Sequence, residues 1–410
     1  MQRMSAATLS PGRLFVAAWL GCAVACPLAM GDDAAVVQRL ESLAAQIEFG
    51  ADGGRRVTGV VIPDGSKATA ADVAACGTLT GLRKLQIYNC RTLDDAAVQW
   101  LVGLQSLDTL ALTNTALTDA AVETIATAFP NLVDLDLSSN TNMTGAAMKW
   151  IAGLEKLQRL GLLQNRFNDL NTRWLGKLKA LEVLDLRGNM EAGDMTLDVL
   201  GKLPHLRALK HRSTVVTDDG IERLAASRSL AALLAQDFAI TSAAGPALGK
   251  IRTLESLEIF RCQGFGSDGV RGLAGLPLKR LTLRDLPDVG DVALAVLPKF
   301  PGLQRLALHE LASVGDQGLA HLAAARQLAV LDIWSLPRMT DATIDVIAGL
   351  PALEELSIRE TSVTDAGLAK LASLPGLQTL VFKDNGPITA ATRTAVTARK
   401  WKKLDLGPTK

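Results

Sequence analysis

One residue pattern recurs along almost the whole chain and constrains its fold more than any other feature. The pattern is Leu-x-x-Leu-x-Leu or a close variant; it starts at Leu82 and Leu107, and each later copy follows after 24 or 25 residues. The same frame extends back to Val57 and forward to Trp401. Fixed periods of about 20–50 residues are typical of repeat proteins. The sequence therefore predicts about fifteen stacked units over residues 57–406.

Each unit divides into a strand half and a helix half. The first half alternates apolar and variable residues, which is the period of a short strand. The second half opens with a pair suited to the start of a helix, as in Thr118-Asp119, Thr217-Asp218, Ser267-Asp268, Thr340-Asp341 and Thr364-Asp365. A hydroxyl or carboxylate there accepts hydrogen bonds from the free N–H groups of the first helical turn. One such unit cannot bury its apolar side alone, so neighbouring units must stack.

These units resemble the leucine-rich repeat family over essentially the whole chain after residue 56. Counted from the first Leu, the ninth position is Asn140, Asn165, Asn189 and Asn385 in four units and Cys90 and Cys262 in two. In that family Asn or Cys at this position bonds backbone groups inside the turn, so the resemblance implies a structural role for both cysteines. The helix opening is similar to the cysteine-containing and ribonuclease-inhibitor-like subclasses, and to exported bacterial members. The resemblance implies an α/β solenoid, a curved arc with a parallel inner sheet and outer helices.

The first residues have the features of an export signal. Arg3 and Arg13 flank a polar start, an apolar run follows over residues 14–25, and small residues precede Asp32. We expect residues 1–31 to be a signal peptide and the protein to be exported, either periplasmic or extracellular. Alternatively, the segment that ends at Cys22 resembles a bacterial lipobox, which would place a lipid anchor there. No later stretch approaches about eighteen apolar residues, so no membrane span is expected.

The remaining chain is predicted to be one domain with a cap at each end. Residues 32–56 are expected to hold a capping helix and its run-in, and residues 57–410 the repeat domain with its C-terminal cap. The first capping helix is predicted over residues 34–48, where Val36, Leu40, Leu43 and Ile47 fall at helical spacing. The last helix is predicted over residues 389–400, ending in two cations that suit a helix C-terminus.

Two neighbouring units break the core pattern. His211 and Ala235 occupy positions that are apolar and large in most other units. A buried Leu contributes about 1.5–3 kcal/mol, so we expect a weak spot over residues 206–237. His211 is predicted to be a hydrogen-bonded core histidine and not a ligand.

Charge and motifs exclude several classes of function. The chain has 43 basic and 42 acidic residues, and residues 1–31 hold two arginines and no acid, which leaves the remainder formally at −1. Proteins that bind nucleic acid usually carry a basic excess, so nucleic acid is not an expected partner. The sequence contains no phosphate-binding loop, no Gly-x-Ser-x-Gly motif and no paired-cysteine zinc motif. We predict no enzymatic activity, no catalytic residue, no cofactor and no metal site.

Two local alternatives stay open. Asp134 and Asp136 point to one side of a predicted strand, where they form either a weak cation site or a solvated acidic pair. Three cysteines follow the leader, and an odd number argues against a full disulfide framework. A bridge between Cys76 and Cys90 remains possible on spacing alone.

Positions 3, 5 and 7 of each unit are expected to face the concave side, because strand side chains alternate. The predicted partner-binding residues are a row at position 7, here called the concave ladder: Phe260, Arg284, His309, Trp334, Arg359 and Lys383. Secondary candidates in the same row are Tyr88, Arg187 and Arg212. Trp and Arg are enriched among the residues that dominate binding energy. The structural alternative is self-neutralisation, with Asp185 pairing Arg187, Glu258 pairing Arg284 and Asp332 pairing Arg359.

The sequence therefore predicts a non-catalytic scaffold for protein–protein recognition. One alternative is a cell-wall or polysaccharide-binding module, in which Tyr88, Phe260 and Trp334 stack on sugar rings. Another is a substrate receptor of a ubiquitin-ligase complex, a role that the resembling subclass also serves. A second candidate surface lies on the helical side, where Trp100 and Trp150 share a helix position with Trp174. Packing between adjacent helices is the structural explanation for those three residues.

Overall fold

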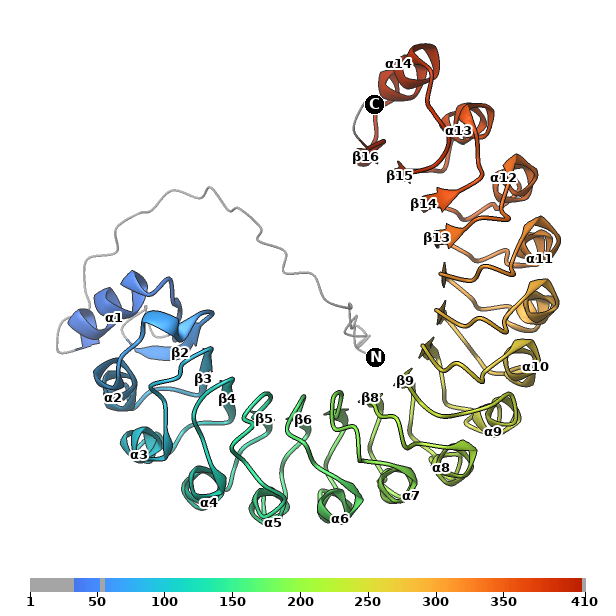
Figure 1. Cartoon of the computed structure of the whole chain (residues 1–410). Coiled ribbons are helices and arrows are strands. Elements are labelled where there is room, and N and C mark those ends of the chain that lie inside the picture. Colours follow the sequence, from blue (N-terminus) through green and yellow to red (C-terminus); the bar gives the residue numbers. More distant parts are fainter. Residues whose placement is uncertain (1–32, 52–55, 408–410) are drawn as a thin grey trace.

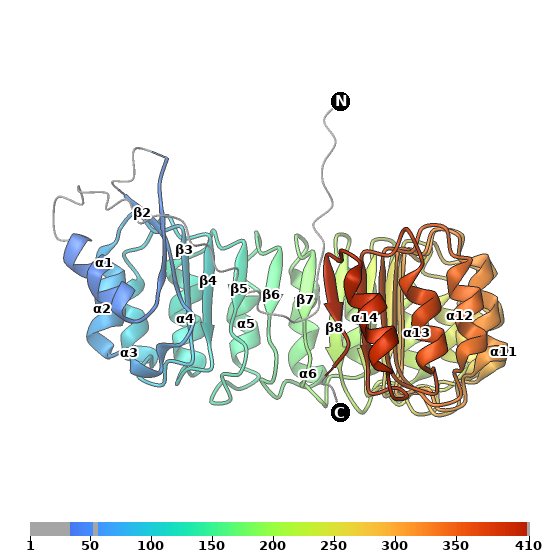
Figure 2. The same ribbon diagram turned by 90° about the horizontal axis from the view of Figure 1, so that it is seen from above.

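A computed structural model describes residues 33–51 and 56–407 of the chain. The predicted signal peptide and Cys22 lie outside the described residues. The described part forms an open arc, with strands along its inner side and helices along its outer rim (Figures 1 and 2). Within these ranges no helix has the length and apolar character needed to cross a membrane.

The strands form one sheet in strict chain order. β2 to β16 are parallel, and β1 pairs with β2 in the antiparallel sense. The strands are β1 (Gln46–Phe49), β2 (Val57–Ile62), β3 (Lys84–Tyr88), β4 (Thr109–Thr113), β5 (Asp134–Asp136), β6 (Arg159–Gly161), β7 (Val183–Asp185), β8 (Ala208–Arg212), β9 (Ala232–Gln236), β10 (Ser256–Phe260), β11 (Arg280–Arg284), β12 (Arg305–His309), β13 (Val330–Leu336), β14 (Glu355–Thr361), β15 (Thr379–Lys383) and β16 (Lys403–Asp405). The solenoid architecture predicted from the repeat is confirmed, one parallel strand to each unit.

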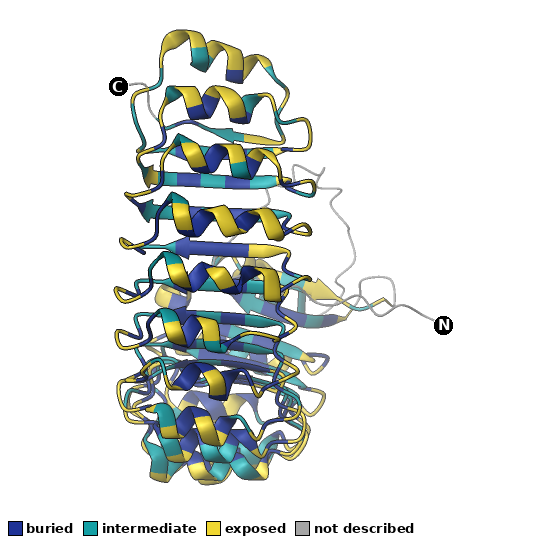
Figure 3. Ribbon diagram, turned by 90° about the vertical axis from the view of Figure 1, so that its right-hand side faces the viewer, coloured by how far each residue is buried: buried dark blue, intermediate teal, exposed yellow. Residues whose placement is uncertain are grey.

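Helices or short 3-10 turns return the chain from each strand to the next. They are α1 (Asp33–Ser42), η1 (Gly65–Lys67), α2 (Ala70–Thr78), α3 (Asp95–Val98), η2 (Gln99–Leu101), α4 (Asp119–Ala128), α5 (Ala147–Ile151), α6 (Asp169–Thr172), η3 (Arg173–Lys177), α7 (Asp194–Gly201), α8 (Asp218–Leu224), α9 (Ala244–Leu248), α10 (Ser267–Gly272), η4 (Asp291–Lys299), α11 (Asp316–Leu319), η5 (Ala320–Ala324), α12 (Asp341–Ala348), α13 (Asp365–Ala372) and α14 (Ala390–Ala398). Each presents buried residues to the sheet and exposed residues to the outside (Figure 3).

Burial alternates along the strands as a half-buried sheet requires. In β11, Leu281 and Leu283 are buried, whereas Arg280, Thr282 and Arg284 are only partly buried. The buried residues of all units join into one continuous core from Leu40 to Leu406. Positions 3, 5 and 7 therefore face the concave side, as predicted.

Threonine caps and aspartates tie successive units together. Thr118, Thr217, Thr340 and Thr364 are N-caps, as predicted. The aspartate after each cap also reaches the next unit: the Asp341 carboxylate accepts hydrogen bonds from the backbone N–H (2.8 Å) and the hydroxyl (2.5 Å) of Thr364. At Ser267 the capping prediction is wrong, because Gly266 is the N-cap and the Ser267 hydroxyl accepts from Gly290 N–H at 3.0 Å.

Buried asparagines satisfy the backbone inside the turns. Asn140 Oδ1 accepts a hydrogen bond from Thr115 N–H at 2.9 Å, and its Nδ2 donates to the carbonyls of Leu112 (2.7 Å) and Leu137 (2.9 Å). Cys262 occupies the equivalent position, and its thiol donates to the Ala235 carbonyl at 3.7 Å. Burial raises the pKa of that thiol to about 12, which suits a structural role.

Cys76, Cys90 and Cys262 are all free and buried, so the structure does not contain the Cys76–Cys90 bridge that spacing left open.

Both ends differ in detail from the predicted caps. α1 ends at Ser42, and Ile47 belongs to β1 rather than to a helix over residues 34–48. The edge of β2 is thereby covered by a strand, which satisfies its backbone groups as a helix would not. At the other end, Arg399 donates to the carbonyls of Ala372 (3.1 Å) and Leu374 (2.5 Å) in the preceding unit. This cation therefore bonds a neighbouring turn as well as ending α14.

Candidate functional site

The concave ladder is continuous in the sheet. Strand register pairs Phe260 with Arg284, Arg284 with His309, His309 with Trp334, Trp334 with Arg359, and Arg359 with Lys383. The six predicted residues thus lie side by side across β10 to β15. Four of them make a stack in which rings and guanidinium groups alternate.

Arg284 is the centre of that stack. Its guanidinium carbon lies 4.4 Å from the Phe260 ring centroid and 5.1 Å from the Trp334 ring centroid. Arg359 lies 5.4 Å from the Trp334 ring, and Arg261 lies 4.6 Å from the Phe260 ring. Cation–π contacts of this kind stabilise by about 0.5–2 kcal/mol and hold the side chains in place.

His309 is the ladder residue that offers least surface. Only 14% of its side chain is exposed, its Nε2 lies 3.1 Å from Asp332 Oδ2, and its ring meets Trp334 edge-on at 5.8 Å. Burial favours the neutral form of Asp332, but the hydrogen bond and charge of His309 and the charge of Arg359 outweigh it, lowering the pKa of Asp332 to about 2. His309 therefore packs against Trp334 and Asp332 and offers a partner little surface.

The ladder cations are neutralised within the chain. Arg359 pairs with Asp332 at 3.1 Å and Arg187 with Asp185 at 2.7 Å, as the self-neutralisation alternative predicted. The Glu258–Arg284 pairing is wrong, because Arg284 pairs with Glu310 at 2.8 Å. Lys383 pairs with Asp405 at 2.5 Å. A partner therefore meets a row of ion pairs rather than a basic strip.

The backbone explains why these partners could not be read from strand alternation. Glu310 follows His309 and has a left-handed φ of 55°, and Asp237 has a φ of 59°. At the residue after position 7 the backbone is therefore no longer extended. The side chain of that residue joins the concave face. Asp237 accordingly binds both Arg212 (2.5 Å) and Arg261 (2.7 Å).

The secondary candidates do not form one site. Tyr88 lies on β3, and β4, β5 and β6 separate it from the strand that precedes Arg187. Burial, with the charges of Asp136 and Asp134, raises the pKa of Tyr88. Arg187 and Arg212 are each held by an ion pair.

A hollow on the concave face was missed by the sequence analysis. It has a volume of about 120 Å³, comparable with cavities that hold one small ring or aliphatic side chain. Its lining includes the small residues Ala208, Ala232 and Ser256 at position 3 of three successive units, together with Leu234 at position 5. That run of small residues is the signal that could have revealed it.

Three cations surround the hollow without an ion pair. Lys210, Arg280 and Arg305 line it, and none makes a salt bridge within the described ranges. Among the described residues, the Arg280 side chain donates only to the Ser256 hydroxyl, at 3.3 Å. Glu258 also lines the hollow; burial raises its pKa, and the charges of Arg284 and other cations partly offset this. The hollow thus combines an apolar floor with an excess of unpaired positive charge.

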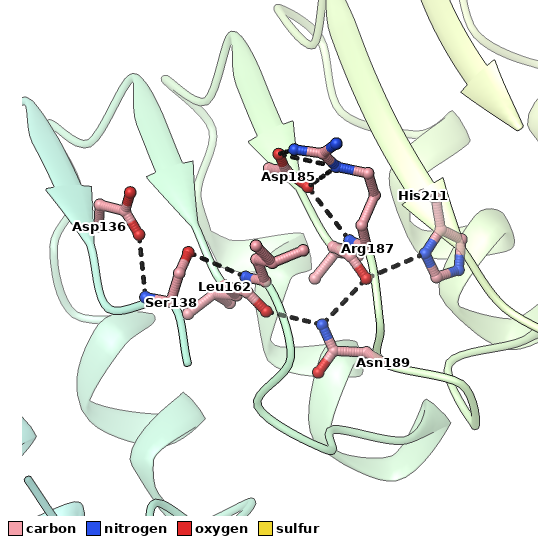
Figure 4. A network of polar contacts seen from close by, with 9 residues as sticks. Asp136, Ser138, Leu162, Asp185, Arg187, Asn189 and His211 are labelled. Carbon is pink, nitrogen blue, oxygen red and sulfur yellow. Dashed lines mark hydrogen bonds and ion pairs between the residues drawn. The ribbon is translucent and has the colours of Figure 1, made fainter. Parts of the chain in front are cut away.

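His211 is a core residue, as predicted, and not part of the site. It is fully buried, and its Nε2 donates to the Ala192 carbonyl at 2.8 Å. Its Nδ1 lies 3.4 Å from the Leu186 carbonyl, and Figure 4 shows the ring beside Asn189 and Arg187. The Phe238 ring packs against it edge-on at 5.4 Å. Burial lowers the pKa of His211, although both carbonyls act in the opposite direction.

The described residues contain no group of three or more His, Cys, Asp or Glu arranged to hold a metal ion. Of the acidic pair on β5, Asp134 binds Arg159 at 2.7 Å, and Asp136 accepts a hydrogen bond from Ser138 N–H at 2.9 Å (Figure 4). Each carboxylate is thus engaged by its own neighbour.

The family model of the leucine-rich repeat region matches residues 117–405. The chain belongs to the leucine-rich repeat family. The units on β2 to β4 continue the same parallel register ahead of that match, so the leucine-rich repeat sheet extends to Val57. Comparison with curated proteins gives no match.

Solved leucine-rich repeat structures share the fold at low identity. The chain is similar to an internalin from Listeria monocytogenes, with 17% identity, a TM-score of 0.50, and coverage of 91% of this chain and 94% of that chain. It is similar to a chain of the yeast Rad7–Elc1 complex, with 20% identity, a TM-score of 0.52, and coverage of 77% and 84%. For TLR13 in complex with ssRNA13 the identity is 19%, the TM-score 0.56, and the coverage 82% of this chain but 50% of that chain. This chain therefore spans half the TLR13 length.

Proposed function

We propose that the protein is an exported, non-catalytic scaffold that binds a protein partner through its concave sheet face. The main support for this proposal is the hollow over β8 to β12. Its apolar floor is surrounded by Lys210, Arg280 and Arg305, and these three cations have no ion-pair partner in the described part of the chain. Unpaired cations beside an apolar pocket suit an extended segment that carries an aliphatic side chain next to a carboxylate. Export rests on residues 1–31, which predict a signal peptide.

The concave ladder continues from this hollow on the same strands. Phe260 and Arg284 lie on β10 and β11, two residues beyond Glu258 and Thr282, which line the hollow. A rigid sheet with side chains already fixed by ion pairs loses little conformational entropy on binding. We therefore place the main contact at the hollow and an extension of the interface along the stack.

The covered aromatic faces favour a protein partner over a polysaccharide. Sugar rings stack on open aromatic faces, but guanidinium groups already lie over the rings of Phe260 and Trp334. Nucleic acid is also disfavoured, because the ladder arginines are paired and the chain after residue 31 is formally at −1. A ubiquitin-ligase receptor has no support in the described ranges, where every element belongs to the solenoid or its caps.

A displayed library of random peptides, selected on the purified protein, tests the proposal. We expect enrichment of peptides that place Asp or Glu beside Leu, Ile, Val or Met. Ala232→Leu fills the hollow and leaves its charges, whereas a Lys210→Gln/Arg305→Gln variant removes charge and leaves the space. Both should lose the selected peptides, and Thr109→Leu, at the equivalent strand position on β4, should retain them.

A Phe260→Ala/Trp334→Ala/Arg359→Ala variant tests the ladder separately. Weaker binding of the selected peptides or of the native partner supports the extended interface, and unchanged binding removes the ladder from it. Enrichment without acidic residues, or equal binding by the Ala232→Leu and Thr109→Leu variants, would rule out the hollow as the site.

A further inference from the structure

A second surface lies on the convex rim, away from the concave face. The outer sides of neighbouring helices there carry exposed apolar residues: Leu170 is 63% exposed, Met195 54%, Trp100 44% and Trp150 39%. Trp174 lies four residues after Leu170, in η3, where it is partly buried and packs against the core. Packing therefore accounts for Trp174 in part, whereas Trp100 and Trp150 remain well exposed.

Exposed large apolar side chains of the described outer helices gather in one short run of the arc, and Val292 on η4, 62% exposed, is the exception. α5, α6 and α7 are consecutive on the outer rim (Figure 1). Trp100 lies in η2, directly after α3, and α4 separates it from α5. In α8 the residues with the same spacing are Asp219 and Arg223, and both are exposed. The convex patch is thus defined by Trp100, Trp150, Leu170, Trp174 and Met195.

Cations without ion pairs accompany the convex patch. Lys149, Arg173, Lys177 and Lys179 are exposed and make no salt bridge among the residues that the structure describes. The Lys177 ammonium lies 5.0 Å and the Arg173 guanidinium 5.5 Å from the Trp174 ring centroid. Two of these cations therefore lie against Trp174, and the four together carry a local positive charge.

A groove beside the tryptophans gathers three of these cations. It has a volume of about 440 Å³ and is lined by Lys149, Lys177 and Lys179, by small residues at the helix ends, and by the single acid Glu155. Lysine ammonium groups around small residues suit an anionic headgroup, and nothing in this lining suits an apolar anchoring side chain. The groove therefore suits the anionic part of an amphipathic ligand, and the exposed tryptophans suit its apolar part.

We propose that the convex patch binds the surface of an anionic phospholipid membrane. Trp favours the boundary between headgroups and acyl chains, and Leu and Met enter the apolar side of that boundary. Lys and Arg next to the boundary attract acidic headgroups. A flat surface touches a convex arc along a few adjacent helices, which is the extent of the patch. A second copy in a symmetric contact would bring the same cations together.

Lysine footprinting on the full chain tests this directly. The protein is acetylated with and without vesicles of phosphatidylcholine that contain about one third phosphatidylglycerol. We expect labelling of Lys149, Lys177 and Lys179 to fall several-fold, while Lys299 and Lys370 on distant helices label as before. Vesicles of phosphatidylcholine alone should protect none of them. Position-specific labelling separates this surface from any lipid contact made by residues 1–31.

Two variants and a matched control extend the test. Lys149→Gln/Lys177→Gln/Lys179→Gln should weaken partitioning onto the anionic vesicles by about 100-fold, since each cation near the surface contributes to binding. Trp150→Ala/Trp174→Ala should weaken partitioning and raise labelling of the groove lysines. Lys250→Gln/Lys299→Gln/Lys370→Gln removes the same charge elsewhere and should bind as the unmodified chain does.

Three results would overturn the proposal. One is unchanged labelling of the groove lysines with anionic vesicles. Another is an equal loss of binding in the two charge variants, which would indicate a diffuse charge effect. The third is concentration-dependent dimerisation that protects the same lysines without lipid, which would assign the patch to self-association.

Discussion

Replacing His211 by Leu isolates the energetic cost of a histidine in a leucine core. The imidazole is fully buried, and burial lowers its pKa in the folded protein. The unfolded chain therefore binds a proton more readily below about pH 6.5, the ordinary value for histidine. Because the unfolded state then holds more protons, the stability of the wild type falls as pH falls. His211→Leu removes this dependence.

The magnitude follows from one proton. Well below pH 6.5, the wild type should lose up to about 1.4 kcal/mol of unfolding free energy per pH unit relative to the variant, until the pKa of the folded state is reached. Near pH 8 the unfolding free energies of the wild type and of His211→Leu should be close. The variant leaves the Ala192 carbonyl, which accepts from Nε2 at 2.8 Å, without a partner, but it gains apolar burial of similar size.

Urea unfolding between about pH 8 and pH 5 measures this difference. His205→Leu is the matched control, because His205 is exposed and precedes the same strand. Its curve should run parallel to that of the wild type, whereas the His211→Leu curve should be flatter at the acidic end. Parallel curves for all three proteins would refute the reasoning, since they would mean that His211 takes up its proton without cost.

Three further predictions concern single features of the fold. Asn140→Ala should lower the unfolding free energy by about 3 kcal/mol, because it leaves several buried backbone groups unpaired; urea unfolding against the exposed Asn131→Ala checks this. Asp332→Asn should cost about 1–2 kcal/mol at neutral pH, and the difference should vanish as pH falls from about 4 towards the folded pKa of about 2, as pH-dependent unfolding would show. Amide exchange should be fastest among interior strands over residues 206–237, and uniform protection would contradict that.

The fold could be predicted from the sequence because the same strand-and-helix pattern recurs in every unit. A strand that buries positions 4 and 6 can present only one face to the core, and β2 to β15 follow this rule. In β16, at the end of the arc, Leu404 is only partly buried. The caps were less predictable, because each occurs once and lacks that repetition. Ile47 fits a helical face by spacing, yet it pairs in β1 because the edge of β2 needs backbone partners.

The concave site was only partly predictable for a related reason. Register fixed the order of the ladder, so the approach of Phe260, Arg284 and Trp334 followed from the repeat. The choice of ion-pair partners did not, because Glu310 lies outside the strand alternation and competes with Glu258 for Arg284. The hollow exists because small residues stand at position 3 of three successive units. A search for Trp and Arg, the residue types that often dominate binding energy, does not find it.

The hollow and the weak spot share the same two strands. Lys210 and Leu234 line the concave side of β8 and β9, and His211 and Ala235 lie next to them on the core side. A ligand in the hollow binds only the folded arrangement of these strands, so it should stabilise them by mass action. We expect a selected peptide to slow amide exchange in β8 and β9 more than in β4. Equal slowing in all three strands would show that the peptide acts elsewhere on the arc, and that the break in the repeat serves the core alone.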